Sequence, residues 1–111
     1  GQEAMAALMD LDDPPTGVFA MSDEMAFGAL MELRQRGLSA PADVSVIGVD
    51  DHEFARVIEL TTIRQDVPSH GANAARLLIR SMEDGDGGPN HAVRHHSPVE
   101  LIVRGTTAPP A

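Results

Sequence analysis

The hydrophobic residues of this chain gather in short runs of strand length, separated by longer segments with a helical pattern. The run at 16–21 shows no internal alternation of polar and apolar residues, which is typical of a strand buried on both faces of a parallel sheet. The predicted strands are 16–21, 44–49, 60–63, 92–96 and 99–103, and the predicted helices are 3–11, 24–36 and 68–83, with a helical turn at 53–58. Helices that alternate with buried strands predict βαβ units, and therefore an α/β fold with a parallel sheet flanked by helices.

Local signals mark the ends of the predicted helices. Pro14 and Pro15 stop the first helix, since proline cannot continue it. Ser22 stands at the start of the second helix, where its hydroxyl can accept a hydrogen bond from a free backbone N–H group. Gly37 can take the left-handed conformation that ends this helix. Pro68 is suited to the first position of the third helix.

Polar residues follow two of the predicted strands at the points where the strands end. Ser22 and Asp23 follow the first of them, and Asp50 and Asp51 follow the second. Ligands of such sheets gather at the carboxyl ends of the strands. A carboxylate held there offers acceptors to a ligand hydroxyl, so Asp50 and Ser22 are candidate ligand-binding residues. The alternatives are that Ser22 and Asp23 only cap the helix, and that both later aspartates are solvated or cap the next turn.

A catalytic or metal site has weaker support. Asp50 and Asp51 could serve as a general acid and base or bind magnesium, but neither a phosphate-binding glycine loop nor a positioned lysine accompanies them. His91, His95 and His96 match no zinc motif, and the chain contains no cysteine. We therefore expect no catalytic residue, no metal and no cofactor.

The helix at 24–36 is apolar on more than one face. The stripe that can cover the sheet consists of Ala26, Leu30 and Leu33. Phe27 and Met31 form a second pair, four residues apart, that points elsewhere. Together with Met25, this pair suggests a buried partner surface, most simply a two-fold dimer contact. The alternative is a helix sandwiched inside its own chain.

Charge and composition narrow the class of protein. The formal net charge is −9, and the 8 Lys and Arg residues form no basic run, so this segment is not expected to contact a phosphate backbone. No apolar run approaches the roughly 20 residues that a membrane span needs. The lack of cysteine fits a reducing cytoplasm. Because the chain starts at Gly1 rather than Met and opens directly into a helical pattern, we expect it to be a fragment of a longer polypeptide.

Four sequence blocks resemble the successive signature blocks at the C-terminal end of LacI/GalR transcription repressors. They are SDEMAFGAL at 22–30, GLSAPADVSVIGVDD at 37–51, LTTIRQ at 60–65 and VRGTTAP at 103–109. Any one block alone is a weak signal, but four in order at suitable spacing form a strong one. The chain is therefore identified as similar to the C-terminal part of the effector-binding domain of this family.

The resemblance implies a type I periplasmic-binding-protein-like fold, in which two α/β lobes close on a small molecule. Residues 1–65 and 97–107 would then belong mainly to the C-terminal lobe, and residues 66–96 would cross to the N-terminal lobe. A helix-turn-helix, absent from this chain, would read operator DNA. We therefore expect the effector-binding and dimerisation segment of a cytoplasmic repressor that responds to a small molecule such as a sugar, with no enzymatic activity.

The resemblance also implies roles for single residues. Ser22 and Asp50 match positions that commonly touch the effector, often a sugar or nucleobase. Gln65 matches a position beside the cleft, where the chain crosses between the lobes. The implied homodimer interface consists of Phe27, Met31 and Ile58, to which the apolar pattern adds Met25.

Two other functions compete with this interpretation. An exported periplasmic sugar-binding protein has a related two-lobed fold and is usually monomeric, but the second apolar stripe of the helix at 24–36 favours a dimeric repressor. A small α/β hydrolase or phosphatase would need a divalent metal at Asp50 and Asp51.

Overall fold

The computed structural model describes residues 1–83 and 96–110 of the chain. The chain forms two compact units, one made of Gly1–Gln65 and Glu100–Ala111 and the other of Asp66–Val99. The first unit contains most of the described helices and strands. The candidate ligand-binding residues all belong to this first unit.

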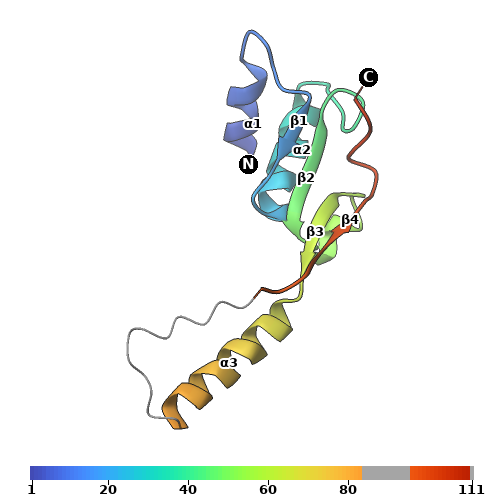
Figure 1. The fold of residues 1–111 in the computed structure, drawn as a ribbon. Helices are drawn as coiled ribbons and strands as arrows, with labels where there is room; N and C mark the ends of the chain where they lie inside the picture. Colours follow the sequence, from blue (N-terminus) through green and yellow to red (C-terminus); the bar gives the residue numbers. More distant parts are fainter. Residues whose placement is uncertain (84–95, 111) are drawn as a thin grey trace. The chain divides into compact units, whose positions relative to one another are not determined.

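A four-stranded sheet in the order β1-β2-β3-β4 organises the first unit (Figure 1). The pairs β1–β2 and β2–β3 are parallel. Val18 lies beside Val46 in the first pair, and Gly48 lies beside Thr62 in the second. The elements are α1 (Gln2–Met9), β1 (Gly17–Phe19), α2 (Asp23–Gln35), β2 (Ser45–Asp50), the short 3₁₀ helix η1 (Glu53–Ala55), β3 (Thr61–Gln65) and β4 (Val99–Ile102), and the second unit contributes α3 (Val67–Glu83).

The predicted α/β fold with a parallel sheet and flanking helices is confirmed, with boundaries that shift by a few residues. The best marked elements agree most closely, since the helix predicted at 24–36 is Asp23–Gln35. The third helix begins at Val67, so Pro68 is its second residue and not its first as predicted. The strand predicted at 92–96 falls almost entirely outside the described residues, which resume at residue 96.

Both predicted signals for α2 are present in the structure. At its start, the Ser22 hydroxyl accepts a hydrogen bond of 3.2 Å from the backbone N–H of Met25. At its end, Gly37 has a φ of 74° and lies in the left-handed region that favours glycine. This turn brings the N–H of Leu38 to 2.8 Å from the carbonyl oxygen of Leu33, which is the pairing of a Schellman cap.

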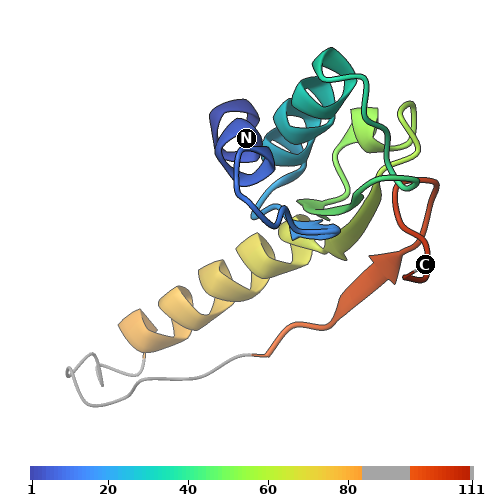
Figure 2. The same ribbon diagram turned by 90° about the horizontal axis from the view of Figure 1, so that it is seen from above.

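The hydrophobic core of the first unit lies on both sides of α2, which packs against the sheet and against α1. Figure 2 shows α1 and α2 on the same side of the sheet. The buried core residues are Met5, Ala20, Ala26, Ala29, Leu33, Val44, Val46, Ala55 and Leu60. Leu30, which we expected to face the sheet, is only partly buried, and Ala29 is buried in its place. Gly28 permits close approach of α1, because a Cβ there would lie 2.8 Å from the backbone nitrogen of Gln2.

The apolar sequence of the first strand predicted burial on both faces, but neither β1 nor β2 is fully covered on both faces in the structure. In β2, Val46 and Gly48 are buried, whereas Ile47 and Val49 on the opposite face are half-buried. Phe19 of β1 is 54% exposed. The reason is that α1 and α2 both cover the same face of the sheet, so the described residues of this unit leave the other face partly open (Figure 2).

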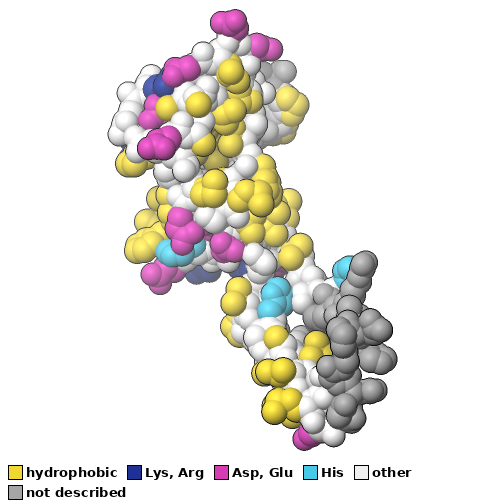
Figure 3. Space-filling view, turned by 90° about the vertical axis from the view of Figure 1, so that its left-hand side faces the viewer, with side chains coloured by type: hydrophobic (Ala, Val, Ile, Leu, Met, Phe, Trp, Pro, Cys, Tyr) yellow, Lys and Arg dark blue, Asp and Glu magenta, His cyan; other side chains and the backbone are white. Residues whose placement is uncertain are grey.

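The second unit is represented by α3, a long amphipathic helix in which no side chain is buried. Its first turn is capped by Asp66, which accepts hydrogen bonds from the backbone and the hydroxyl of Ser69 at 3.1 and 2.6 Å. These bonds lower the pKa of the Asp66 carboxyl. Leu78 and Met82 are exposed, and Figure 3 shows hydrophobic side chains at the molecular surface. None of the described helices is long and apolar enough to cross a membrane.

Candidate ligand-binding site

Three parallel strands end at one edge of the sheet, and the residues predicted to bind a ligand lie at these ends. Asp50 is the last residue of β2, and Gln65 is the last residue of β3. Ser22 lies between the end of β1 and the start of α2. Because the three strands run in parallel, all of these residues belong to the carboxyl edge of the sheet. This is the edge at which parallel α/β folds bind ligands.

The structure brings two of the predicted residues into direct contact. The side-chain amide of Gln65 donates a hydrogen bond of 2.8 Å to Oδ1 of Asp50. Asp50 is exposed, so its carboxylate can also be reached by a small molecule. Ser22 uses its oxygen to cap α2, as one of the alternatives stated, but a hydroxyl also has a proton to donate.

Asp51 is held in place by two arginines that the sequence did not single out as its partners. Arg104 Nη2 lies 2.6 Å from Oδ1 of Asp51, and Arg64 Nε lies 2.8 Å from Oδ2. Burial raises the pKa of the Asp51 carboxyl, but the hydrogen bonds from Arg104 and then Arg64 outweigh burial and hold the pKa below its usual value. Asp51 is therefore a charged structural anchor and is not placed as a second free ligand-binding carboxylate.

The ion pairs of Asp51 predict a pH dependence of stability. A carboxyl whose pKa is lowered on folding stabilises the fold above its ordinary pKa, and this stabilisation is lost as the pH falls through the lower, folded-state value. Wild type should therefore be more stable than Asp51→Asn at about pH 6, and the difference should shrink below about pH 4. Urea denaturation of both proteins across this pH range measures it. An advantage of wild type that stays constant down to about pH 2 would contradict the role of these ion pairs.

Asp23 joins three elements at this edge from a fully buried position. Its Oδ1 accepts a hydrogen bond of 2.6 Å from the Thr62 hydroxyl, and its Oδ2 accepts one of 2.7 Å from the backbone N–H of His52. Gly48 leaves the room for this carboxylate, because a Cβ at that position would overlap it. Asp23 thus ties the start of α2 to β3 and to the segment after β2, and it stabilises the edge that carries the candidate ligand-binding residues.

Replacing Asp23 should destabilise the protein strongly. In Asp23→Ala, the Thr62 hydroxyl and the His52 N–H lose their partner inside the protein, which typically costs about 2–4 kcal/mol in total. The measurement is the free energy of unfolding in urea. Asp43→Ala is the matched control, because Asp43 is exposed and accepts hydrogen bonds only near the protein surface, from Ser39. If both substitutions lower the free energy of unfolding equally, the buried hydrogen bonds of Asp23 stabilise the protein no more than the exposed ones of Asp43.

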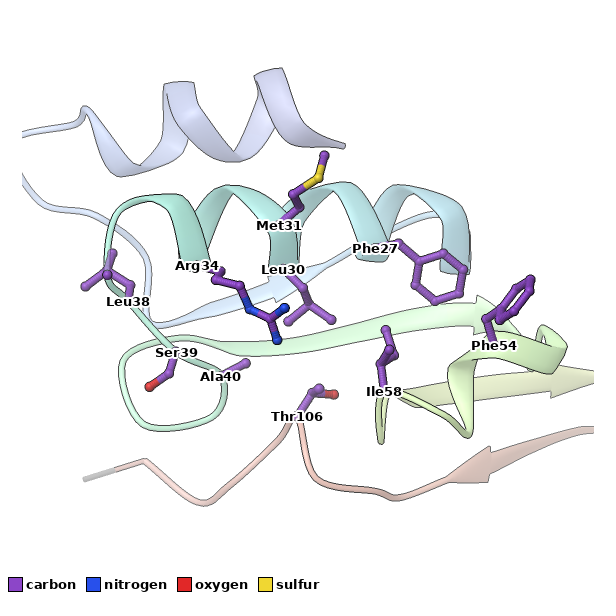
Figure 4. Close-up of a pocket in the computed structure, with 11 residues that line it drawn as sticks. Phe27, Leu30, Met31, Arg34, Leu38, Ser39, Ala40, Phe54, Ile58 and Thr106 are labelled. Carbon is purple, nitrogen blue, oxygen red and sulfur yellow. The ribbon is translucent and has the colours of Figure 1, made fainter.

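An apolar groove, here called the α2 groove, lies beside α2 in the first unit. It encloses about 750 Å³. Its lining residues are Phe27, Leu30, Met31, Arg34, Gly37, Leu38, Ser39, Ala40, Phe54, Ile58 and Thr106. Figure 4 shows side chains from α2 on one wall and Phe54 and Ile58, from the segment after β2, on the other.

The α2 groove contains three of the four residues predicted for the dimer interface. Phe27, Met31 and Ile58 line it, whereas Met25 is 40% exposed outside it. Phe54 belongs to the same surface and was not predicted. Its ring stacks on the His52 ring with centroids 5.4 Å apart, and His52 in turn meets Phe27 edge to face. These aromatic contacts join the two walls of the groove.

Comparison with known proteins identifies the fold family. The family model of the periplasmic binding protein-like domain matches residues 1–107. This chain belongs to that family. The HTH-type transcriptional repressor CytR of Escherichia coli is 39% identical over 109 residues, which make up 96% of this chain and 31% of CytR. The chain thus spans about a third of the length of the curated relatives it matches.

Solved structures of the family agree with the observed fold. A LacI family transcriptional regulator from Enterococcus faecium with bound ribose has a TM-score of 0.80 and 34% identity, over 99% of this chain and 40% of the regulator. The Lac repressor dimer, bound to operator and the anti-inducer ONPF, has a TM-score of 0.80 and 30% identity, over 96% of this chain and 36% of the repressor. The predicted resemblance to LacI-type regulators is therefore confirmed, and the chain is a partial periplasmic-binding-protein-like lobe.

The family relationship also bears on the catalytic alternatives. The relatives are transcriptional repressors and not enzymes, so a hydrolase or phosphatase is not supported. Within residues 1–83 and 96–110, no three His, Asp or Glu side chains gather as a metal site would require. His91 and His95 lie outside the described residues, and His96 is exposed.

Proposed function

We propose that this chain is the effector-binding and dimerisation segment of a LacI-type transcriptional repressor. The observation that carries the proposal is the pairing of Asp50 with Gln65 at the carboxyl edge of the sheet. These two side chains come from the ends of neighbouring strands, and Ser22 follows the strand on the other side of β2. Together they form one wall of a ligand cleft, and the other wall belongs to a part of the protein outside this chain.

The chemistry of this wall suits a ligand with hydroxyl groups. The Asp50 carboxylate accepts hydrogen bonds, the Gln65 amide can donate and accept them, and the Ser22 hydroxyl can donate one. Arg64 and Arg104, two cations beside Asp50 in the structure, are already paired with the carboxylate of Asp51. A neutral sugar or a related metabolite fits this arrangement better than an anion. The ribose bound to the Enterococcus faecium regulator supports this class of effector.

The proposed dimer forms through the α2 groove, with a second copy of the chain as its occupant. The groove is mainly apolar, and three of its hydrophobic residues remain exposed in the single chain, with Met31 at 49%, Phe54 at 56% and Ile58 at 42%. Exposed apolar surface of this kind marks a contact with another protein. The dimeric state of the related Lac repressor supports a second copy as that protein.

We place the proposed repressor in the cytoplasm and assign operator binding to a helix-turn-helix elsewhere in the protein. The net charge of this chain is −9, so its own surface would be repelled by DNA. Residues 66–96 would cross to the second lobe, which would cover the exposed apolar side chains of α3. An effector that favours one arrangement of the lobes would then shift the affinity for operator, with a coupling of the order of 1–3 kcal/mol.

The proposal is tested on the full-length protein with a panel of unphosphorylated pentoses, hexoses and nucleosides. Thermal unfolding should shift upward with at least one of them, because a ligand that binds only the folded state stabilises it. The same compound should change the affinity for operator DNA in a gel-shift titration. A protein that binds sugars but is monomeric and binds no DNA would instead be the exported binding protein of related fold.

A further inference from the structure

The backbone that presents Asp50 is strained. Asp50 has a φ of 116° and Asp51 has a φ of 54°, so two consecutive residues with side chains lie in the region that favours glycine. Such a conformation costs free energy and persists only where the surrounding structure enforces it. The direction of the Asp50 side chain therefore depends on contacts that hold this turn.

The strongest of these contacts act on Asp51 and not on Asp50. The Asp51 carboxylate lies between the guanidinium groups of Arg104 and Arg64, at 2.6 and 2.8 Å. The side chains of Asp51 and Arg104 are only 12% and 10% exposed, whereas that of Arg64 is 43% exposed. Arg104 is thus the better shielded partner, and its ion pair is the less screened by water.

Arg104 is itself fixed by further contacts with Leu60, the residue before β3, and with Thr61, the first residue of β3. Its Nη1 donates a hydrogen bond of 2.8 Å to the carbonyl oxygen of Leu60, and its backbone N–H donates one of 2.9 Å to the Thr61 hydroxyl. The backbone N–H of Asp51 donates a longer bond of 3.3 Å to Thr62. The turn after β2 is thereby clamped to β3 through a side chain that lies 53 positions along the chain from Asp51.

We propose that Arg104 is a positioning residue for effector binding: by holding Asp51, it fixes the strained turn in which Asp50 faces Gln65 and the ligand. The inference rests on the proposed function, because Asp50 is taken as the ligand-binding carboxylate. Arg104 need not touch the effector. Without its guanidinium group the turn relaxes toward negative φ, and the Asp50 carboxylate turns away from Gln65.

Two variants of the full-length protein separate positioning from mere stability. Arg104→Gln should bind D-ribose about tenfold more weakly than wild type. In the double variant Asp51→Gly with Arg104→Gln, glycine adopts φ near 54° without strain, so the turn no longer depends on the ion pair between Asp51 and Arg104. This double variant should therefore recover most of the affinity, although it restores no ion pair. Isothermal titration calorimetry measures all three proteins.

The matched control is Arg36→Gln. Arg36 also bridges two carboxylates, those of Asp10 and Glu32, but it joins α2 to α1 away from the strand ends. Its loss should lower the thermal unfolding temperature and leave the affinity for ribose unchanged. Unchanged affinity in Arg104→Gln, or a double variant as weak as the single one, would overturn the proposal.

A crystal structure of full-length Arg104→Gln provides a test that needs no ligand. The expected result is that Asp50 no longer accepts a hydrogen bond from Gln65, while α2 and its cap at Ser22 are unchanged. Retention of the Asp50–Gln65 bond at its present 2.8 Å would refute the positioning role. If wild type binds no ribose, that result excludes ribose as the effector and leaves the other sugars and nucleosides of the proposed function to be tested, while this structure alone decides the role of Arg104.

Discussion

Asp50→Ala is expected to weaken effector binding by about 30-fold to 150-fold. Hydrogen bonds to a charged group contribute about 1.5–3 kcal/mol each, so losing the carboxylate removes about 2–3 kcal/mol of binding free energy. The variant also frees the Gln65 amide from its present partner, which leaves the pocket wall less ordered. Calorimetric titration with whichever compound of the sugar and nucleoside panel binds wild type measures the loss.

The fold and the dimer should survive this change, because Asp50 is exposed and contributes nothing to the core. Asp43→Ala is the control for the loss of one negative charge, since Asp43 lies before the start of β2, at the opposite edge of the sheet. It should bind the effector as wild type does. If Asp50→Ala keeps wild-type affinity, the carboxyl edge of the sheet is not the effector site.

Met31→Asp is expected to convert the dimer to monomers. Met31 lines the α2 groove and is 49% exposed in the single chain. In a dimer formed through this groove, the new carboxylate would be buried among mainly apolar side chains. Burial of the charge costs several kcal/mol, which Arg34, the cation in the groove lining, offsets only in part. A penalty of about 3 kcal/mol raises the dimer dissociation constant roughly 150-fold. Sedimentation velocity across a dilution series measures it.

Leu11→Asp is the control for this variant. Leu11 is also an exposed hydrophobic residue, at 53%, but it follows α1 and is not part of the α2 groove. The same change of polarity there should leave the dimer intact. A Met31→Asp protein that remains dimeric would show that the copies meet elsewhere, and the apolar groove would then need another occupant.

The sequence predicted best those features that depend on neighbours along the chain. The helix α2 was placed within one residue at each end, because Ser22 caps its start and Gly37 permits the turn at its end. The run of mainly apolar residues at 44–49, directly before Asp50, likewise marked β2. Placing Ser22 and Asp50 at one sheet edge followed from the βαβ pattern, which forces neighbouring strands to run in parallel.

Contacts between distant residues could not be predicted in the same way. Asp51 pairs with Arg104, and Asp23 accepts a hydrogen bond from Thr62, but no local pattern distinguishes these partners from other arginines or threonines. Burial of β1 on both faces was predicted but is not observed, since Phe19 is 54% exposed. An apolar sequence shows that a strand can be covered, but it does not show that a helix of the same unit covers it. Phe54 of the α2 groove was missed because a single aromatic residue in a short turn has no periodicity.

The most direct test of the account is a crystal structure of the full-length protein with the compound that binds it. Two places in the first unit could hold a small molecule. One is the carboxyl edge of the sheet, where parallel α/β folds bind ligands. The other is the α2 groove, whose volume of about 750 Å³ is within the range of ligand pockets. We predict that a hydroxyl group of the compound lies within hydrogen-bond distance of Asp50, with the α2 groove covered by a second copy of the chain. A compound seated between Phe27 and Ile58, away from Asp50, would contradict the account.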